Sequence, residues 1–173
     1  VYKEFTVGVS EASGSKSRTE LGSDGESVLW VEGDKIRVFA DVEGANPDGY
    51  TVTVKEIGID ESTGKQTATI GGQVANADKF YALYPYDAYN ETGGLIKENG
   101  SVYICANIPD NQSVSVDGGY DPKACISVAE LNSDGGEFKL ACGILGFRFK
   151  DKTATSVEIK EIQVDITDRT LSN

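Results

Sequence analysis

The chain has 173 residues, 20 of them Gly, and a formal net charge of −12 at pH 7. Its length suits a domain with a substantial hydrophobic core, and its negative charge with no basic patch disfavours binding to nucleic acid or to an anionic lipid surface. The chain contains no His, which excludes catalytic systems with a His base and His-ligated zinc and leaves few enzyme classes. A glycosidase with two carboxylates is one of them, but 28 acidic residues always provide some suitable pair, so we expect no enzyme activity and no cofactor.

The first part of the chain alternates apolar and polar residues, which predicts half-buried β-strands. Residues 2–9 form the first candidate strand, and residues 10–24, rich in Ser, Gly and charge, predict an exposed loop. Residues 27–31 and 36–40 predict a hairpin around a turn at residues 32–34.

The middle of the chain holds the most apolar strand. Residues 50–59 continue the alternation, but the apolar face switches, which predicts a bulge near residues 56–58. Residues 66–70 are polar and rich in Thr, which suits a sheet edge or a solvated face. Residues 79–86 are apolar on both faces, which predicts a central strand that ends near Pro85.

The last part of the chain shows further strand patterns. Residues 87–99 predict a long loop or a loose hairpin, and residues 102–108 and 125–129 predict short strands. Residues 138–149 predict a second central strand, and residues 157–166 a final strand. With about 7–10 strands and no long helix, the pattern is that of a sandwich or a barrel, and we predict an all-β, two-sheet β-sandwich.

Two residue classes bear on disulfides and metals. The odd number and wide spacing of the cysteines favour buried free thiols over one disulfide plus one free thiol. They are Cys105, Cys125 and Cys142. Asp110, Asp117 and Asp121 offer oxygen ligands for calcium, but their spacing matches no dense calcium loop, so we interpret them as solvated turn residues and predict no metal site.

Aromatic residues raise a carbohydrate-binding alternative, because exposed Trp and Tyr rings stack on sugars. The candidate stacking residues are Trp30, Tyr86 and Tyr89, with Tyr103 as a further member of the platform. For Trp30 we favour a place in the core, since a lone ring is weak evidence for a ligand.

Several short motifs follow one another between residues 2 and 150. They are Arg18-Thr19, Leu29-Trp30 with Glu32-Gly33-Asp34-Lys35-Ile36, Phe80-Tyr81-Ala82-Leu83-Tyr84-Pro85, Asp121-Pro122 with Ile126-Ser127-Val128-Ala129, and Cys142-Gly143-Ile144-Leu145-Gly146-Phe147. In this order and spacing they make the chain similar to the N-terminal domain of the fimbrillin-like proteins of Bacteroidales. The resemblance implies a transthyretin-like, Greek-key β-sandwich over residues 1–155, with residues 156–173 as a final strand or the start of a further domain.

The resemblance also implies a function. Such proteins are non-enzymatic fimbrial (pilus) subunits or adhesins, exported as lipoprotein precursors to the outer membrane and cell surface. Their partners are other fimbrial subunits, bound through strand exchange, with a host protein or glycan as a further candidate; a lipid anchor outside this chain would provide the membrane contact. In polymerising members an arginine-specific protease removes the first strand, and a donor strand fills the groove. On this chain that cut falls after Arg18, although a solvated loop charge is an equally acceptable reading of this residue.

Overall fold

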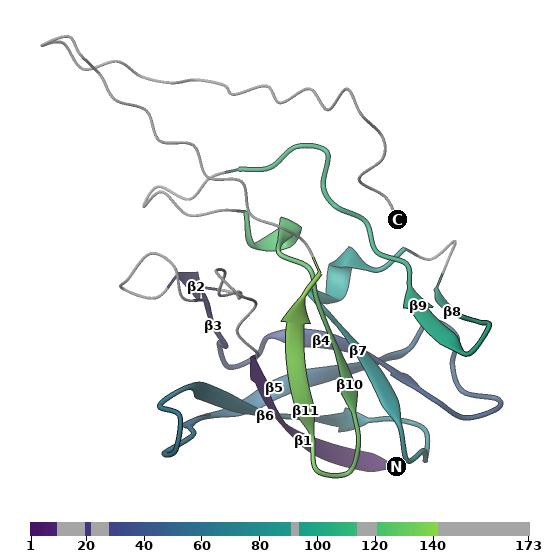
Figure 1. Ribbon diagram of the computed structural model, residues 1–173, viewed down its shortest axis with the longest axis horizontal. Coiled ribbons are helices and arrows are strands. Elements are labelled where there is room, and N and C mark those ends of the chain that lie inside the picture. The colour runs from purple at the N-terminus through teal and green to yellow at the C-terminus, as the bar shows by residue number, and fades with distance from the viewer. Residues whose placement is uncertain (10–19, 22–27, 91–93, 114–120, 142–173) are drawn as a thin grey trace, which may run out of the picture.

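The computed structural model describes residues 1–9, 20–21, 28–90, 94–113 and 121–141, and its main body is a barrel (Figure 1). The barrel strands are β1 (Tyr2–Val9), β4 (Lys35–Ala40), β5 (Tyr50–Ile59), β6 (Gln66–Gln73), β7 (Phe80–Tyr84), β10 (Ser127–Leu131) and β11 (Gly136–Leu140). They close in the order β1-β11-β10-β7-β4-β5-β6. Neighbouring strands are antiparallel, except that β1 and β11 are parallel.

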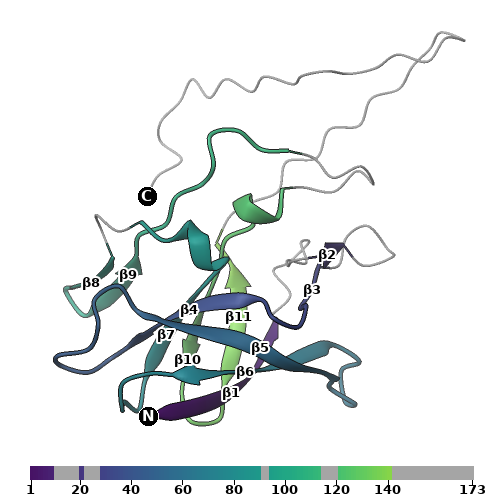
Figure 2. The same ribbon diagram turned by 180° about the vertical axis from the view of Figure 1, so that it is seen from behind.

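Two small strand pairs and two short helices complete the described structure. They are β2 (Glu20–Leu21) with β3 (Val28–Leu29), β8 (Leu95–Glu98) with β9 (Ser101–Ile104), and the 3-10 helices η1 (Tyr86–Ala88) and η2 (Pro122–Ala124). The β2-β3 pair and the β8-β9 hairpin lie on opposite sides of the barrel (Figures 1 and 2). For residues 87–99 the sequence allowed a long loop or a loose hairpin, and the structure has the hairpin β8-β9. Its turn uses Asn99 and Gly100, both with positive φ.

The prediction of an all-β fold is confirmed, but the strands do not separate into two independent sheets. Figure 1 shows β10 and β11 running steeply across the direction of β5 and β6, as layers do in orthogonal packing. Pairing of β1 with both β6 and β11 joins these layers at one side, and pairing of β4 with β7 joins them at the other. The hydrogen-bonded ladder is therefore closed.

The barrel interior holds the main hydrophobic core, and β7 shows how the sequence pattern produces it. Phe80, Ala82 and Tyr84 point inward, while Leu83 is buried on the outer side. Because β7 has β4 and β10 as neighbours and is covered on both faces, the prediction of a central strand is confirmed. The strand ends before Pro85, which has no N–H to donate and follows a cis peptide bond.

A second, smaller apolar cluster lies outside the barrel wall, and we call it the outer cluster. Its buried members are Phe39, Leu83, Ala88, Tyr89 and Ile126. Half-buried residues of the β8-β9 hairpin, Leu95 and Ile104, pack against it. This cover explains why a β7 side chain that points away from the barrel interior is apolar as well.

The hairpin predicted for residues 27–31 and 36–40 is wrong. β3 pairs with β2, whereas β4 pairs with β5 and β7. The backbone between them is held instead by a side chain: Gln66 Oε1 accepts a hydrogen bond from Trp30 N at 2.6 Å, and Gln66 Nε2 donates to Trp30 O at 3.5 Å. The Gln66 amide thus takes the place of a neighbouring strand for this residue.

Two predictions on β5 and β6 have different outcomes. The bulge in β5 is present between Val54 and Glu56, just before the predicted residues. Of the two alternatives for residues 66–70, the sheet edge is wrong, because β6 lies between β1 and β5, whereas the Thr side chains lie on a partly open face. Ala68 and Ile70 are buried in the core, and the Thr residues occupy the alternate positions on the other face.

Several other predicted elements are shifted or fall outside the described residues. The strands predicted at 102–108 and 125–129 correspond to β9 and β10, and β11 covers the start of the predicted strand 138–149. The loop at 10–24 lies largely outside the described residues, and the strand at 157–166 and the domain boundary after residue 155 lie wholly outside them.

Candidate functional site

The strongest candidate site is the place where β1 closes the barrel, and we call β1 with its neighbours β6 and β11 the β1 seam. Residues 2–7 of β1 pair with residues 68–73 of β6, and residues 7–9 pair with residues 136–138 of β11. Phe5 and Val7 are buried in the core. The first strand is therefore both a backbone link and a part of the hydrophobic core.

Four contacts at the start of the chain hold β1 in place. The Phe5 ring meets the Phe80 ring edge to face, with 5.1 Å between centroids. The Lys3 ammonium lies 5.0 Å from the Phe80 ring centroid and donates a hydrogen bond to Ala77 O at 2.5 Å. The N-terminal amine donates to Val74 O at 2.8 Å.

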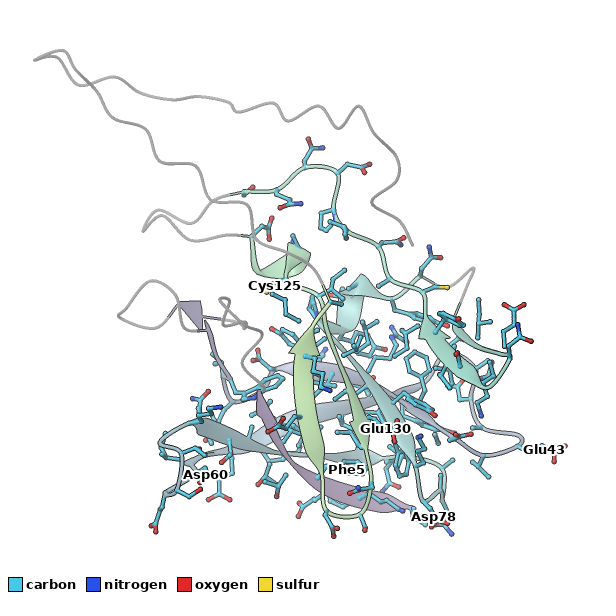
Figure 3. The ribbon with its side chains drawn as sticks, viewed as in Figure 1. Phe5, Glu43, Asp60, Asp78, Cys125 and Glu130 are labelled. Carbon is cyan, nitrogen blue, oxygen red and sulfur yellow. The ribbon has the colours of Figure 1, made fainter. Side chains whose placement is uncertain are left out.

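Removal of β1 would leave a defined vacancy. The facing edges of β6 and β11 would lose their hydrogen-bond partners, and the groove between them would expose the apolar surface that Phe5 and Val7 now cover. An unpaired strand edge beside an apolar groove is a binding site for an extended peptide. In Figure 3, Phe5 lies on β1 within the body of the barrel.

The predicted cleavage residue, Arg18, lies outside the described residues. The predicted removable segment, residues 1–18, contains the whole of β1. The described part of the site is thus the strand that such a cut would release.

Trp30 is 2% exposed, which confirms its predicted place in the core. Its ring packs edge-on against Tyr84 at 5.3 Å and against Phe138 at 5.2 Å. The indole Nε1 is buried without a hydrogen-bond partner in the part of the chain that the structure describes. A ring enclosed in this way is not accessible to a sugar, so Trp30 is not a stacking platform in this structure.

Tyr86 and Tyr89 do come together, but around a cation of the protein itself. The Arg37 guanidinium carbon lies 3.9 Å from the Tyr86 ring centroid and 4.3 Å from that of Tyr89. Arg37 also donates to Tyr86 O at 3.4 Å and to Asp48 O at 2.5 Å. Tyr89 is 7% exposed, so these rings form a structural cation–π contact. Tyr103, at 54% exposed, is more open and lies on β9.

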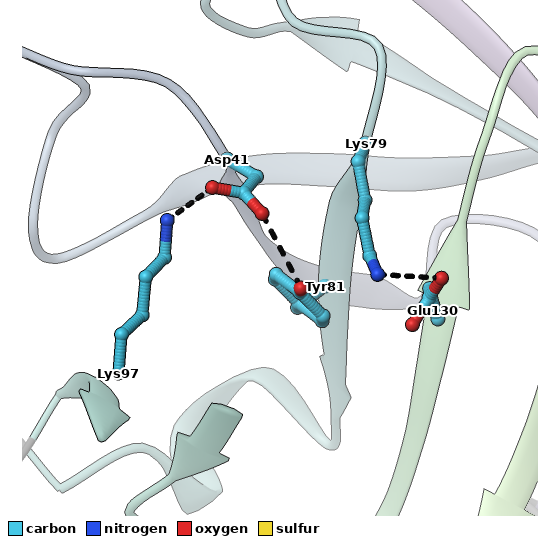
Figure 4. A network of polar contacts seen from close by, with 5 residues as sticks. All are labelled: Asp41, Lys79, Tyr81, Lys97 and Glu130. Atoms are coloured by element: carbon cyan, nitrogen blue, oxygen red, sulfur yellow. Dashed lines mark hydrogen bonds and ion pairs between the residues drawn. The ribbon is translucent and has the colours of Figure 1, made fainter. Parts of the chain in front are cut away.

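A set of polar contacts that the sequence did not indicate connects the residue after β4, the barrel strands β7 and β10, and the β8-β9 hairpin (Figure 4). Asp41 accepts hydrogen bonds from Lys97 of β8 and from the hydroxyl of Tyr81 of β7. Lys79 forms an ion pair with Glu130 of β10 at 2.8 Å. The hydrogen bond to Glu130 raises the pKa of the Lys79 amine, and the hydrogen bond from Lys97 lowers the pKa of the Asp41 carboxyl.

The depressed pKa of Asp41 predicts a pH dependence of stability. A carboxyl whose pKa is lower in the folded protein stabilises it above the unfolded pKa, about 3.8, and loses that contribution as the pH falls through the folded value. Asp41→Asn should lower the free energy of unfolding by up to about 1 kcal/mol at pH 6, because the ion pair is partly exposed. In urea unfolding, the gap between wild type and variant should shrink below pH 4; a gap that stays constant to pH 3 would contradict the assignment.

Beside this network lies an open hollow of about 410 Å³, lined by Asp41, Val42, Asn76, Ala77, Asp78 and Lys79. The charged groups that line the hollow have both signs, since the carboxylates of Asp41 and Asp78 lie there together with the amine of Lys79. The acidic residues labelled in Figure 3, among them Glu43, Asp60 and Asp78, lie at separate places around the barrel. Within the described residues, no group of three Cys, Asp or Glu side chains could hold a metal ion.

The structure describes two of the three cysteines and two of the three calcium candidates. Cys125 is buried, Cys105 is half-buried and forms no disulfide with another described residue, and Cys142 lies outside the described ranges, so their thiol state stays a prediction. Asp121 accepts hydrogen bonds from Ser113 N and Lys123 N, as expected for a turn residue. Asp110 is exposed, and Asp117 lies outside the description.

Comparison with known proteins gives no family: no family model, curated protein or solved structure matches the chain. A search of the described residues for a helix long and apolar enough to cross a membrane finds none.

Proposed function

We propose that this chain is a non-enzymatic structural module of the cell surface, a fimbrial subunit or adhesin that exchanges its first strand. The observation that carries the proposal is the β1 seam. The strand β1 joins two other strands and fills the core with Phe5 and Val7. A cut in the segment that follows β1 lets this strand leave without breaking the connection between the remaining strands, and the groove that it vacates fits another extended strand.

The geometry of the seam favours exchange over simple loss of β1. A barrel that lacks β1 exposes both apolar surface and two strand edges, and each is a strong reason to bind a new strand. The partners in this proposal are therefore other subunits of the same kind, with a lipid anchor outside this chain for the membrane. The finer fold assignment, a transthyretin-like Greek key in two layers, is supported by the pairing of β4 with β7 and of β7 with β10, which are not consecutive along the chain.

The alternative, a carbohydrate-binding module, has less support. Trp30 and Tyr89 are buried, and Arg37 covers the rings of Tyr86 and Tyr89. Tyr103 is the candidate aromatic that the structure leaves most open. A glycan that binds tightly and is lost in Tyr103→Ala without loss of folding would favour this alternative.

Limited proteolysis with an arginine-specific protease tests strand exchange. We expect a cut after Arg18, followed by dissociation of residues 1–18 and by oligomers in size-exclusion chromatography. Arg37 should resist the protease because it lies in a paired strand with its guanidinium held by two backbone oxygens.

Arg18→Gln is the matched control, since it removes the proposed cut and leaves β1 unchanged. This variant should keep residues 1–18 and remain monomeric under the same conditions. A wild-type chain that is not cut after Arg18, or a cut product that stays monomeric, would contradict the proposal.

A further inference from the structure

The β8-β9 hairpin is attached to the barrel differently from every barrel strand. Among the described residues, β8 and β9 pair only with each other. Their backbone links to the rest of the molecule lie at the base of the hairpin, where Asn90 N donates to Cys105 O at 3.0 Å and Asn107 N donates to Ala88 O at 2.7 Å. An isolated two-stranded hairpin is marginally stable in water, so its order depends on what it packs against.

The two faces of the hairpin have different environments. Leu95 and Ile104 are direct cross-strand partners and pack against the outer cluster. Ile96 and Tyr103 are the next pair, and they are 41% and 54% exposed on the opposite face. The hairpin thus covers the outer cluster with few side chains of its own.

Beyond its base and the packing of Leu95 and Ile104, one ion pair connects the hairpin to the barrel within the described structure. It joins Lys97 of β8 to Asp41, the residue after β4. The Lys97 side chain is 51% exposed, and water and salt screen an exposed ion pair. The barrel strands are held by ladders on both sides, so the hairpin is the part of this region with the weakest attachment.

We propose that the β8-β9 hairpin is a detachable cover, which lifts as a unit from the outer cluster while the barrel remains folded. Opening breaks the Lys97–Asp41 pair, removes Leu95 and Ile104 from the cluster, and uncovers Phe39 and Leu83 on the outer wall. The opened wall is a second apolar face, formed by β4 and β7 and separate from the β1 seam. This inference does not depend on strand exchange, because β1 stays in place.

The test combines two measurements on the full chain. Hydrogen–deuterium exchange should be at least about tenfold faster for residues 95–104 than for residues 80–84 of β7. Hydroxyl-radical footprinting should modify Phe39 of the outer cluster faster than Phe80 of the barrel interior, although both are buried in the closed structure.

Lys97→Met removes the ion pair and keeps an unbranched side chain. It should raise exchange at residues 95–104 and modification of Phe39 roughly two- to fivefold, and leave β7 and Phe80 unchanged. Lys35→Met is the control, because Lys35 is exposed on β4 and forms no ion pair with any described residue; it should change neither signal.

Two results would overturn the proposal. Equal protection of residues 95–104 and β7 would show that the hairpin opens only with the whole protein. Fast exchange at residues 95–104 with Phe39 as protected as Phe80 would show that the hairpin frays in place and does not lift.

Discussion

Phe5→Ala should destabilise the protein by about 3–5 kcal/mol, the usual range for removal of a buried aromatic side chain. Phe5 is buried in the barrel core and packs edge-on against Phe80. The cavity left behind cannot collapse easily, because β1 is fixed by β6 along residues 2–7 and by β11 along residues 7–9. Urea unfolding of wild type and variant measures this difference.

Glu4→Ala is the matched control for this variant. Glu4 is the next residue on the same strand, its side chain lies on the exposed face, and its loss should change stability by less than about 1 kcal/mol. A similarly small effect of Phe5→Ala would mean that β1 is not part of the core, and the proposed strand exchange would lose its basis.

Phe5→Ala also connects stability to the proposed function. The variant weakens the hold on β1 but leaves the sequence around Arg18 intact. After cleavage, residues 1–18 should therefore dissociate faster than in the wild type, while the rate of cleavage stays the same. A faster release would locate the barrier to exchange in the packing of the first strand.

The elements that the sequence predicts well are those whose signal is local. Residues 2–9 form β1 and alternate from Glu4 onward, and residues 79–86 are apolar on both faces and contain β7. For Trp30, the size of the ring alone predicts a position in the core, and the side chain is buried in the core. Each of these predictions needs only the period of the pattern or the nature of one side chain.

The features that the sequence could not show depend on contacts between residues that are far apart along the chain. The closure of the barrel needs the parallel pairing of β1 with β11, more than a hundred residues away, and no local pattern encodes a neighbour. The polar residues of 66–70 suggest a sheet edge or a solvated face, because their outward Thr side chains conceal the burial of Ala68 and Ile70. The failed hairpin has a similar cause, since a Gln66 side chain in place of a strand leaves no periodic signal.

The candidate site shows the same limit. The sequence indicates Tyr86 and Tyr89 as neighbouring aromatics, and they do lie together, but Arg37 and Asp48 arrive from a different part of the chain. Likewise Asp41 and Lys97 are ordinary surface charges until the fold brings them together. Only the tertiary structure assigns a partner to each of these groups.

Among the described glycines, replacement of Gly135 by Ala should have the largest effect. Gly135→Ala should lower the free energy of unfolding by more than about 4 kcal/mol or prevent folding. Gly135 has φ +104, which an L-residue adopts only with strain. A Cβ at this position would also overlap the carbonyl oxygen of Thr6 on β1, since the turn between β10 and β11 lies directly against that strand. Backbone atoms cannot rotate away as a side chain can, so the overlap must be relieved by displacement of β1.

Gly33→Ala is the control that separates the cost of a positive φ from the cost of steric overlap with a neighbouring strand. Gly33 has a similar φ of +88, but a Cβ there would meet no atom within 4 Å. Because no described residue would be overlapped, its replacement should cost about 1–2 kcal/mol, the penalty for a left-handed conformation. Equal effects of the two substitutions in urea unfolding would contradict the contact between Gly135 and Thr6, and with it the closure of the barrel at the β1 seam.

The overlap in Gly135→Ala exists only while β1 occupies the seam, which gives the variant a second use. If cleavage after Arg18 releases the first strand, the product that lacks residues 1–18 should tolerate the added methyl group, whereas the intact chain should not. The difference in stability between Gly135→Ala and wild type, measured on the monomeric cut products before a donor strand fills the groove, should therefore shrink to that of Gly33→Ala. An undiminished difference in these monomers would show that β1 remains in place after cleavage, and strand exchange could not proceed.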